Sequence, residues 1–264
     1  MIDSIVESII HMTERSLSFV GVFDFGTSDV SPAKVINVYK AGIQMAENPK
    51  NKQEVPTAVK DKNLVNRRRR QIVDASVALF VANGFHKTTT REIARATGMS
   101  IGSLYEYVST KEDILYLVCD AIHAEMEHYV DEVLSHHQPV LETVRQAVRG
   151  YFTACDRMSD HILLIYQVTQ FLPAKWMGRV LDNEIRVTGI FKTLLGKIVA
   201  AGEVQGVDDR RIELVAHNIA VLGHAWAFRR WFYRRHYTLE AYIAFQTENI
   251  LGAFTGKNEA IDQR

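Results

Sequence analysis

The chain of 264 residues has two cysteines, five prolines and no long apolar run. Cys119 and Cys155 have no paired spacing, which argues against a disulfide framework or a cysteine-rich metal site and fits a reducing compartment. No stretch of about 18 apolar residues occurs, and the start of the chain lacks a basic segment followed by an apolar run. We therefore expect a cytoplasmic protein that does not span a membrane, with both cysteines in its core.

The sequence also has few residues in the arrangements that catalysis needs. His123, Glu125 and His128 lie close together in sequence, but two histidines five residues apart point to different faces of a helix. There is no His-Glu-x-x-His motif, no phosphate loop and no glycine pattern for nucleotides. We expect no enzyme activity, no metal site and no cofactor.

Net charge is zero over the whole chain, yet cationic residues gather in one segment. Residues 66–111 contain eight cationic and three acidic residues, a net charge of +5. Four arginines, Arg67 to Arg70, precede a helical pattern that ends at Gly84. Cations at a helix start oppose the helix dipole, so this run favours an external anion such as phosphate. A basic face that is merely solvated is the alternative.

Two short helices joined by a tight turn are predicted next. Thr89 and Glu92 form a capping box, so a helix should begin at this point. Gly98 should end it, because glycine tolerates the left-handed conformation, and Ser100 should cap a second helix from residue 101 to about residue 108. This order of elements is that of a helix-turn-helix.

A longer series of motifs covers the same region. It runs through Thr89-Thr90-Arg91-Glu92-Ile93-Ala94, then Gly98, then Ser100-Ile101-Gly102-Ser103-Leu104-Tyr105, then Lys111-Glu112-Asp113-Ile114-Leu115. From Thr88 to Leu115 the chain closely resembles the DNA-binding domain of the TetR family of bacterial transcriptional regulators. Tyr107-Val108 departs from the His-Phe pair that is common in the family, which bears on local packing and half-site preference.

The resemblance implies two sets of DNA-binding residues. Phosphate contacts are implied for Thr90, Arg91 and Lys111, and the charge argument adds Arg67 and Arg68. The groove-facing surface is implied for Ser100, Ile101, Gly102, Ser103, Tyr105 and Tyr107. The second helix carries no arginine, asparagine or glutamine, so thymine methyl contacts, hydroxyl contacts and DNA shape should carry sequence discrimination.

Beyond Ile114 the patterns are helical, with breaks at Gln138-Pro139, Met158-Ser159-Asp160, Leu172-Pro173 and Gly202 to Asp209. We predict an all-α fold with four parts: an N-terminal extension and linker (1–65), a helix-turn-helix DNA-binding domain (66–112), a helical effector-binding and dimerisation domain (113–256) and a tail (257–264). The role of the extension is open between a separate interaction element and a loosely ordered or dimer-packed segment.

Two apolar stripes near the C-terminus predict a homodimer interface. The first comprises Ile212, Val215, Ile219, Leu222 and Trp226, and the second comprises Leu239, Tyr242, Ile243, Ile250 and Phe254. In proteins resembling TetR, the last two long helices pair with their twins, and the dimer reads two half-sites of a palindromic operator. Packing within one subunit is the alternative.

Effector binding is predicted from aromatic and cationic residues. Tyr166, Phe171 and Trp176 line a pocket or fill a core. The run from Trp226 to His236, which includes Arg229 and Arg230, resembles the C-terminal region of acyl-CoA-responsive TetR-like proteins. A solvated helix end is the alternative for these arginines.

These predictions describe a ligand-responsive regulator, most simply a repressor that is released from its operator by a small apolar or acyl-CoA-like effector. The helix starting at Lys111 is the expected lever. The alternative from another class is a helical ligand-binding or adaptor protein with vestigial DNA contact and a partner-binding extension. The effector, the operator and the direction of regulation are not readable from the sequence.

Overall fold

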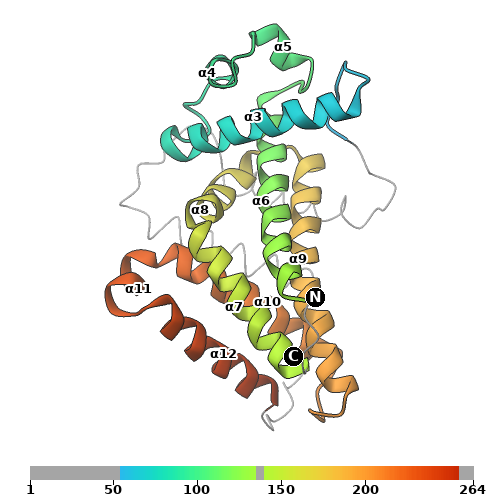
Figure 1. Ribbon diagram of the computed structural model, residues 1–264, viewed down its shortest axis with the longest axis vertical. Helices are drawn as coiled ribbons and strands as arrows, with labels where there is room; N and C mark the ends of the chain where they lie inside the picture. The colour runs from blue at the N-terminus through green and yellow to red at the C-terminus, as the bar shows by residue number, and fades with distance from the viewer. Residues whose placement is uncertain (1–53, 135–139, 256–264) are drawn as a thin grey trace. The chain divides into compact units, whose positions relative to one another are not determined.

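In the computed structural model, residues 54–134 and 140–255 are described, and every regular element in these ranges is a helix (Figure 1). The helices are α3 (Lys62–Asn83), α4 (Thr90–Ala96), α5 (Ile101–Tyr105), α6 (Lys111–Leu134), α7 (Val140–Arg157), α8 (Ser159–Val168), the 3-10 helix η1 (Thr169–Phe171), α9 (Ala174–Ala200), α10 (Asp209–Phe228), α11 (Arg230–His236) and α12 (Leu239–Thr255). The all-α prediction is confirmed. None of these helices is long and apolar enough to cross a membrane.

The described residues form two compact units. Within the described ranges, unit 1 comprises residues 54–76, 89–117 and 167–182, and unit 2 comprises residues 77–88, 118–134, 140–166 and 183–255. Helices α3, α6, α8 and α9 contribute residues to both units. The expected elements before residue 54, the break at Gln138-Pro139 and the tail at 257–264 lie outside the described residues.

In unit 1 the predicted helix-turn-helix is present, and α4 packs against α5. The Thr89 hydroxyl accepts the backbone N–H of Glu92, and the Glu92 carboxylate accepts the N–H of Thr89, which completes the capping box. Gly98 has φ of +69°, the left-handed conformation that ends a helix. The Ser100 hydroxyl then accepts the N–H of Ser103. The core beneath is formed by fully buried Ile72, Ile93, Leu104, Ile114 and Leu115.

Two predicted helix boundaries in unit 1 are wrong. Helix α3 begins at Lys62, because the Asp61 carboxylate accepts the N–H groups of Asn63 and Leu64, so the arginine run lies inside the helix instead of before it. Helix α5 ends at Tyr105, three residues earlier than expected. Its last turn closes through i to i−3 hydrogen bonds, and the carbonyl of Glu106 accepts from Ala58 instead of continuing the helix.

Unit 2 has helix α7 packed against α10 and α12 (Figure 1). Gly223 permits the close approach of α10 to α7, because a Cβ at this position would lie 2.7 Å from Tyr151 Cε1 and 2.9 Å from Cys155 Sγ. The largest fully buried side chains of this unit are Phe80, Tyr151, Phe152, Phe191, Trp226 and Phe254. Cys119 and Cys155 are both buried free thiols, as predicted for core residues.

The two apolar stripes assigned to a dimer interface pack inside the subunit instead. Eight of the ten side chains are buried in the single chain: Ile212, Val215, Ile219, Trp226, Tyr242, Ile243, Ile250 and Phe254. Leu222 and Leu239 are half-buried. The assignment of these stripes to an interface is therefore wrong, because α10 and α12 turn the stripes toward each other and toward α7. Their outer faces carry other apolar side chains, Leu214, Val221 and Phe245, and these are exposed.

Candidate nucleic-acid interface

The start of α4 and helix α5 together form an exposed polar surface. Thr90 is the first residue of α4, and its hydroxyl lies 3.2 Å from the phenol oxygen of Tyr105. Tyr105 is 47% exposed, and Ser100 and Arg91 are exposed as well. These residues combine hydroxyl groups with a cation, which are the groups that bind phosphate oxygens and base edges.

The other residues expected at the groove divide into exposed and buried ones. Ile101 is 39% exposed, and Gly102 is exposed, where a Cβ would make only an ordinary contact with Ser100 Oγ at 3.8 Å. Ser103 is half-buried. Tyr107 is only 5% exposed and belongs to the core, so the expectation that it faces the groove is wrong. It follows the end of α5, where the chain turns inward.

The arginine run shows the helical periodicity of α3. Arg67 and Arg70 are exposed, and the Arg68 guanidinium donates to the Gln71 side chain at 3.0 Å. Arg69 instead turns inward, and its guanidinium donates to the backbone carbonyls of Val55, Pro56 and Tyr107. Consecutive residues of a helix point about 100° apart, so four adjacent cations cannot share one face.

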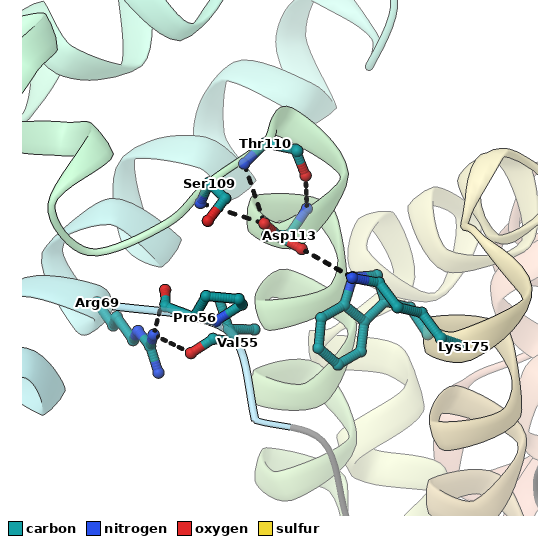
Figure 2. A network of polar contacts seen from close by, with 8 residues as sticks. Val55, Pro56, Arg69, Ser109, Thr110, Asp113 and Lys175 are labelled. Carbon is teal, nitrogen blue, oxygen red and sulfur yellow. Dashed lines mark hydrogen bonds and ion pairs between the residues drawn. The ribbon is translucent and has the colours of Figure 1, made fainter. Parts of the chain in front are cut away.

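The start of α6 is held by a buried carboxylate. Asp113 Oδ2 accepts the N–H groups of Ser109 at 3.2 Å and Thr110 at 3.0 Å, while the Thr110 hydroxyl accepts the N–H of Asp113 (Figure 2). The other oxygen, Oδ1, accepts the indole N–H of Trp176 at 2.8 Å, and Lys175 Nζ lies 3.9 Å from it. One carboxylate thus joins the first turn of α6 to the first turn of α9.

Lys111, the first residue of α6, is half-buried. Burial lowers the pKa of its ammonium, and the carboxylates of Glu112 and Glu92 oppose this shift. A cation kept close to Glu92 on α4 and placed at the start of α6 fits the phosphate contact that the family resemblance implies.

Trp176 fills the core of unit 1. It is fully buried and stacks on Tyr116 with ring centroids 4.2 Å apart, while Lys175 and Arg179 lie over the outer faces of the two rings. The expectation that Trp176 lines an effector pocket is therefore wrong, because both ring faces and the N–H already have partners. Phe171 is half-buried and also belongs to unit 1.

The other expected effector residues belong to unit 2, where Tyr166 takes part in a polar cluster around His224. The phenol oxygens of Tyr151 and Tyr166 lie 2.9 Å and 3.0 Å from the two ring nitrogens of His224. A neutral imidazole has one donor and one acceptor nitrogen, so one phenol donates and the other accepts. Burial lowers the pKa of His224 to about 4; Glu184 opposes the shift and His123 adds to it. The cluster is therefore uncharged at neutral pH.

Trp226 and the arginines that follow it are tied to aspartates of α7 and α8. The indole N–H of Trp226 and the guanidinium of Arg234 both donate to Asp156, at 2.6 Å and 2.8 Å. Arg230 pairs with Asp160 at 2.6 Å. Trp226 is buried in the core, so the expectation that it faces an effector is wrong. Arg230 has a carboxylate partner at the surface, and its role in effector binding stays a prediction.

Arg229 remains exposed, and its guanidinium lies 5.1 Å from the ring centroid of Trp231. Sequence reasoning missed the contacts of five residues around which the sites are organised: Arg69, Asp113, Tyr151, Asp156 and His224. Only the position of Asp113, three residues after Thr110, gave a usable capping signal. The partners of the other four are distant in sequence. No group of three or more histidine, cysteine or acidic side chains in the described ranges is arranged to hold a metal ion.

Comparison with known proteins agrees with this geometry. Residues 72–116 match the family model of bacterial regulatory proteins of the tetR family. The HTH-type transcriptional regulator HbdR of Aromatoleum sp. (strain CIB) is 31% identical over 195 residues, which cover 72% of this chain and 82% of HbdR. The fatty acid metabolism regulator protein of Bacillus subtilis (strain 168) is 26% identical over 143 residues, or 53% of this chain and 73% of that protein.

Among solved structures, AibR in complex with isovaleryl coenzyme A and operator DNA has a TM-score of 0.56 and 18% identity, covering 69% of this chain and 97% of AibR. That likeness concerns the fold. The match to the family model lies over the helix-turn-helix, and the match to HbdR extends over most of both chains. The chain therefore belongs to the TetR family of bacterial transcriptional regulators and is a DNA-binding regulator.

Proposed function

We propose that the protein is a homodimeric repressor that binds a palindromic operator and releases it when a small apolar or acyl-CoA-like effector binds. The observation that best supports DNA binding is the surface of exposed Arg91, Ser100 and Tyr105 in unit 1, together with half-buried Thr90, whose hydroxyl lies 3.2 Å from the Tyr105 phenol oxygen. The adaptor alternative is not favoured, because the family relatives are transcriptional regulators. For the same reason we propose no enzymatic activity, and we propose that the protein acts in the cytoplasm, where a bacterial regulator meets its operator.

The proposed DNA contacts are the exposed or half-buried members of the predicted set: Arg67, Arg68, Thr90, Arg91, Ser100, Ile101, Gly102, Ser103, Tyr105 and Lys111. Residues 66–112 remain our proposal for the DNA-binding domain and residues 113–256 for the effector-binding and dimerisation domain. Tyr107 is no longer included, because its side chain is buried.

We place the effector in unit 2, near the cluster of Tyr151, Tyr166 and His224. An uncharged group of two phenols and an imidazole offers both a donor and an acceptor to a polar ligand group such as a thioester carbonyl. A fatty acid metabolism regulator among the relatives and the isovaleryl-CoA complex of AibR support a coenzyme A thioester as the first candidate. Arg229, which is exposed, is the cation of the predicted set that we propose for a phosphate.

The proposed signal passes through α6 and α9, which are two of the helices with residues in both units. Asp113 links their first turns, because its carboxylate accepts from Ser109, Thr110 and Trp176. An effector shifts the equilibrium only by binding one state more tightly than the other. A shift of α9 at Trp176 would move the Asp113 carboxylate and with it the chain segment that follows α5.

For the dimer, we propose the outer faces of α10 and α12 in place of the buried stripes. Leu214 and Val221 lie seven residues apart on α10, which places them on one face of the helix, and Phe245 on α12 is 65% exposed. Large apolar side chains that remain exposed in the single chain are the usual core of a subunit interface. A dimer would also supply the two readers that a palindromic site requires.

Fluorescence anisotropy with a labelled fragment of DNA from upstream of the protein's own gene tests this function. Against random DNA, we expect a preference of about a thousandfold or more and a steep fall in affinity as salt rises. Isovaleryl-CoA and a long-chain acyl-CoA are the probes for release. Absence of any DNA preference would restore the adaptor interpretation, whereas preference without release would exclude these thioesters as effectors.

A further inference from the structure

Residues 54–61, here named the strap, precede the region that matches the family model. We propose that the strap and Arg69 form a positioning device for the recognition helix α5, so that Arg69 supports sequence discrimination without touching DNA. The strap belongs to the N-terminal segment whose role the sequence left open. The device acts on the established DNA-binding function and does not depend on the proposed effector.

The strap is fastened to the end of α5 at one carbonyl group. The backbone N–H of Ala58 donates to the Glu106 carbonyl at 2.9 Å, and the Thr57 hydroxyl donates to the same oxygen at 2.8 Å. Glu106 is the C-cap of α5, where helix carbonyls lack partners from the next turn. The strap therefore supplies both hydrogen-bond donors to the C-cap carbonyl of the recognition helix.

Arg69 also connects the strap to the residues that follow α5, because it bonds carbonyl groups of both segments. Its guanidinium donates to the Tyr107 carbonyl through both Nε at 3.1 Å and Nη2 at 3.0 Å. It also donates to the Val55 carbonyl at 2.6 Å (Figure 2). Pro56 accepts a further bond at 3.2 Å. Val55 is itself buried in the core. One planar cation thus ties α3, the strap and the residue after α5 into a fixed arrangement.

The chemistry requires arginine at this position. Three carbonyl groups arranged around one side chain match the rigid fork of guanidinium donors, whereas the single ammonium of lysine cannot reach the same set with the same geometry. The carbonyl oxygens carry no net charge. Among the described residues, the Arg69 guanidinium is therefore held by hydrogen bonds and not by an ion pair. Burial lowers the pKa of Arg69, and the carboxylates of Glu54 and Asp113 oppose that shift.

The rival explanation is that Arg69 contacts phosphate like its neighbours in the run. The two explanations predict different DNA-binding behaviour. Removing a phosphate contact weakens binding to all sequences equally and lowers the salt dependence. A positioning residue affects the groups that read sequence, so its removal lowers operator affinity more than affinity for random DNA.

The test compares Arg69→Gln, Arg69→Lys and the matched control Arg70→Gln in the full chain. Arg70 is adjacent and exposed, and its replacement removes the same formal charge. Relative to Arg70→Gln, Arg69→Gln should lose about tenfold or more of the operator-to-random preference with an unchanged salt slope. Arg69→Lys should behave like Arg69→Gln, because it restores the charge without the three carbonyl bonds. Full rescue by lysine, or an equal loss on both DNAs with a smaller salt slope, would overturn the proposal.

A second measurement reports on the strap without DNA. Hydrogen exchange at the Ala58 amide should be fast in Arg69→Gln and Arg69→Lys and remain slow in Arg70→Gln; unchanged protection in the first two would also overturn the proposal. If Arg69→Gln does not fold, Thr57→Val removes one of the two donors to Glu106 and should lower operator preference by about twofold to threefold. If the unaltered protein shows no operator preference, the proposed function fails. The hydrogen-exchange data would then still test whether Arg69 holds the strap in place.

Discussion

The two arginine-rich regions of this protein are similar in sequence, but their arginines have different partners in the structure. In unit 1, Arg67 to Arg70 lie within α3; in unit 2, four further arginines occur between residues 229 and 235. Near each run, a buried tryptophan donates its indole N–H to an aspartate: Trp176 to Asp113 in unit 1, and Trp226 to Asp156 in unit 2. The regions differ in what else these aspartates accept.

In unit 2 the carboxylates neutralise arginines, since Asp156 binds Arg234 and Asp160 binds Arg230. In unit 1 the Asp113 carboxylate accepts backbone N–H groups, and the buried arginine donates to carbonyls. Among the residues that the structure describes, no carboxylate pairs with an arginine of the first run, while two of the four arginines of the second run are paired. A run of arginines indicates an anion site only when its neighbours in space, and not only in sequence, leave the charge uncompensated.

The largest expected difference between the two runs is in DNA binding. Replacing both Arg67 and Arg68 with glutamine should lower operator affinity roughly tenfold to a hundredfold at low salt and reduce the salt slope by about 0.9 for each phosphate that is no longer neutralised. Replacing both Arg229 and Arg235 with glutamine should leave affinity and slope unchanged in the absence of an effector. Anisotropy titrations over a salt series measure both quantities.

The two double variants control for each other, because each removes the same formal charge from the chain. An equal loss of DNA affinity in both would mean that total charge, not the position of α3, governs binding, and the comparison between the two regions would fail. Circular dichroism should show unchanged helix content, since Arg67, Arg229 and Arg235 are exposed and Arg68 donates to Gln71 on its own helix.

A smaller difference is expected from the two indole–carboxylate bonds. Trp176→Phe and Trp226→Phe each remove one hydrogen bond to an aspartate from a nearly fully buried ring, so each should lower the free energy of unfolding by about 1–3 kcal/mol. Only Trp176→Phe should also weaken operator binding, because Asp113 holds Ser109 and Thr110 at the start of α6. Urea denaturation and operator titration measure the two effects.

Because Trp176→Phe and Trp226→Phe should lose similar stability, a difference between them in operator binding reports on the role of Asp113. If both variants reduce operator binding equally, the effect follows from stability alone and the proposed link between α9 and α6 through Asp113 is wrong. If Trp176→Phe binds operator normally but is no longer released by a thioester that releases the unaltered protein, the link acts on release and not on basal binding.

The sequence predicted the parts of this protein that depend on local chemistry. The capping box at Thr89, the left-handed Gly98 and the cap at Ser100 all follow from residues within three or four positions of one another. The predicted end of α5 was wrong because a residue distant in sequence bonds to it. The end of α5 depends on Ala58, 48 residues away from Glu106, and no local pattern contains that hydrogen bond.

The expected effector contacts of Trp176 and Trp226 failed for a related reason. Aromatic and cationic residues have the same composition whether they line a pocket or fill a core, and only their partners distinguish the two. Asp156 and Asp113 lie about 60 to 80 residues from the indoles and the arginine that they bind, so they could not be paired with them in advance. The apolar stripes of α10 and α12 likewise predicted burial correctly but not the surface that buries them.

The smallest expected effect concerns pH and separates the uncharged cluster of unit 2 from both arginine regions. Burial lowers the pKa of His224 to about 4, below the value of 6.5 that it has when unfolded. Between these values the unfolded chain binds a proton that the folded chain excludes, so stability falls as pH falls from about 6.5 to about 4 and is unaffected by His224 above that window. The loss between pH 7 and pH 5 should reach up to about 2 kcal/mol.

Urea denaturation of the unaltered protein and His224→Gln at pH 7 and pH 5 isolates this contribution, because the other titrating groups are common to both. Glutamine keeps one donor and one acceptor for the phenols of Tyr151 and Tyr166 but does not titrate. The variant should therefore lose less stability on acidification than the unaltered protein. An equal loss in both would mean that His224 takes up a proton in the folded state, and the cluster would then be cationic at mildly acidic pH and suited to an anionic ligand group instead of a neutral one.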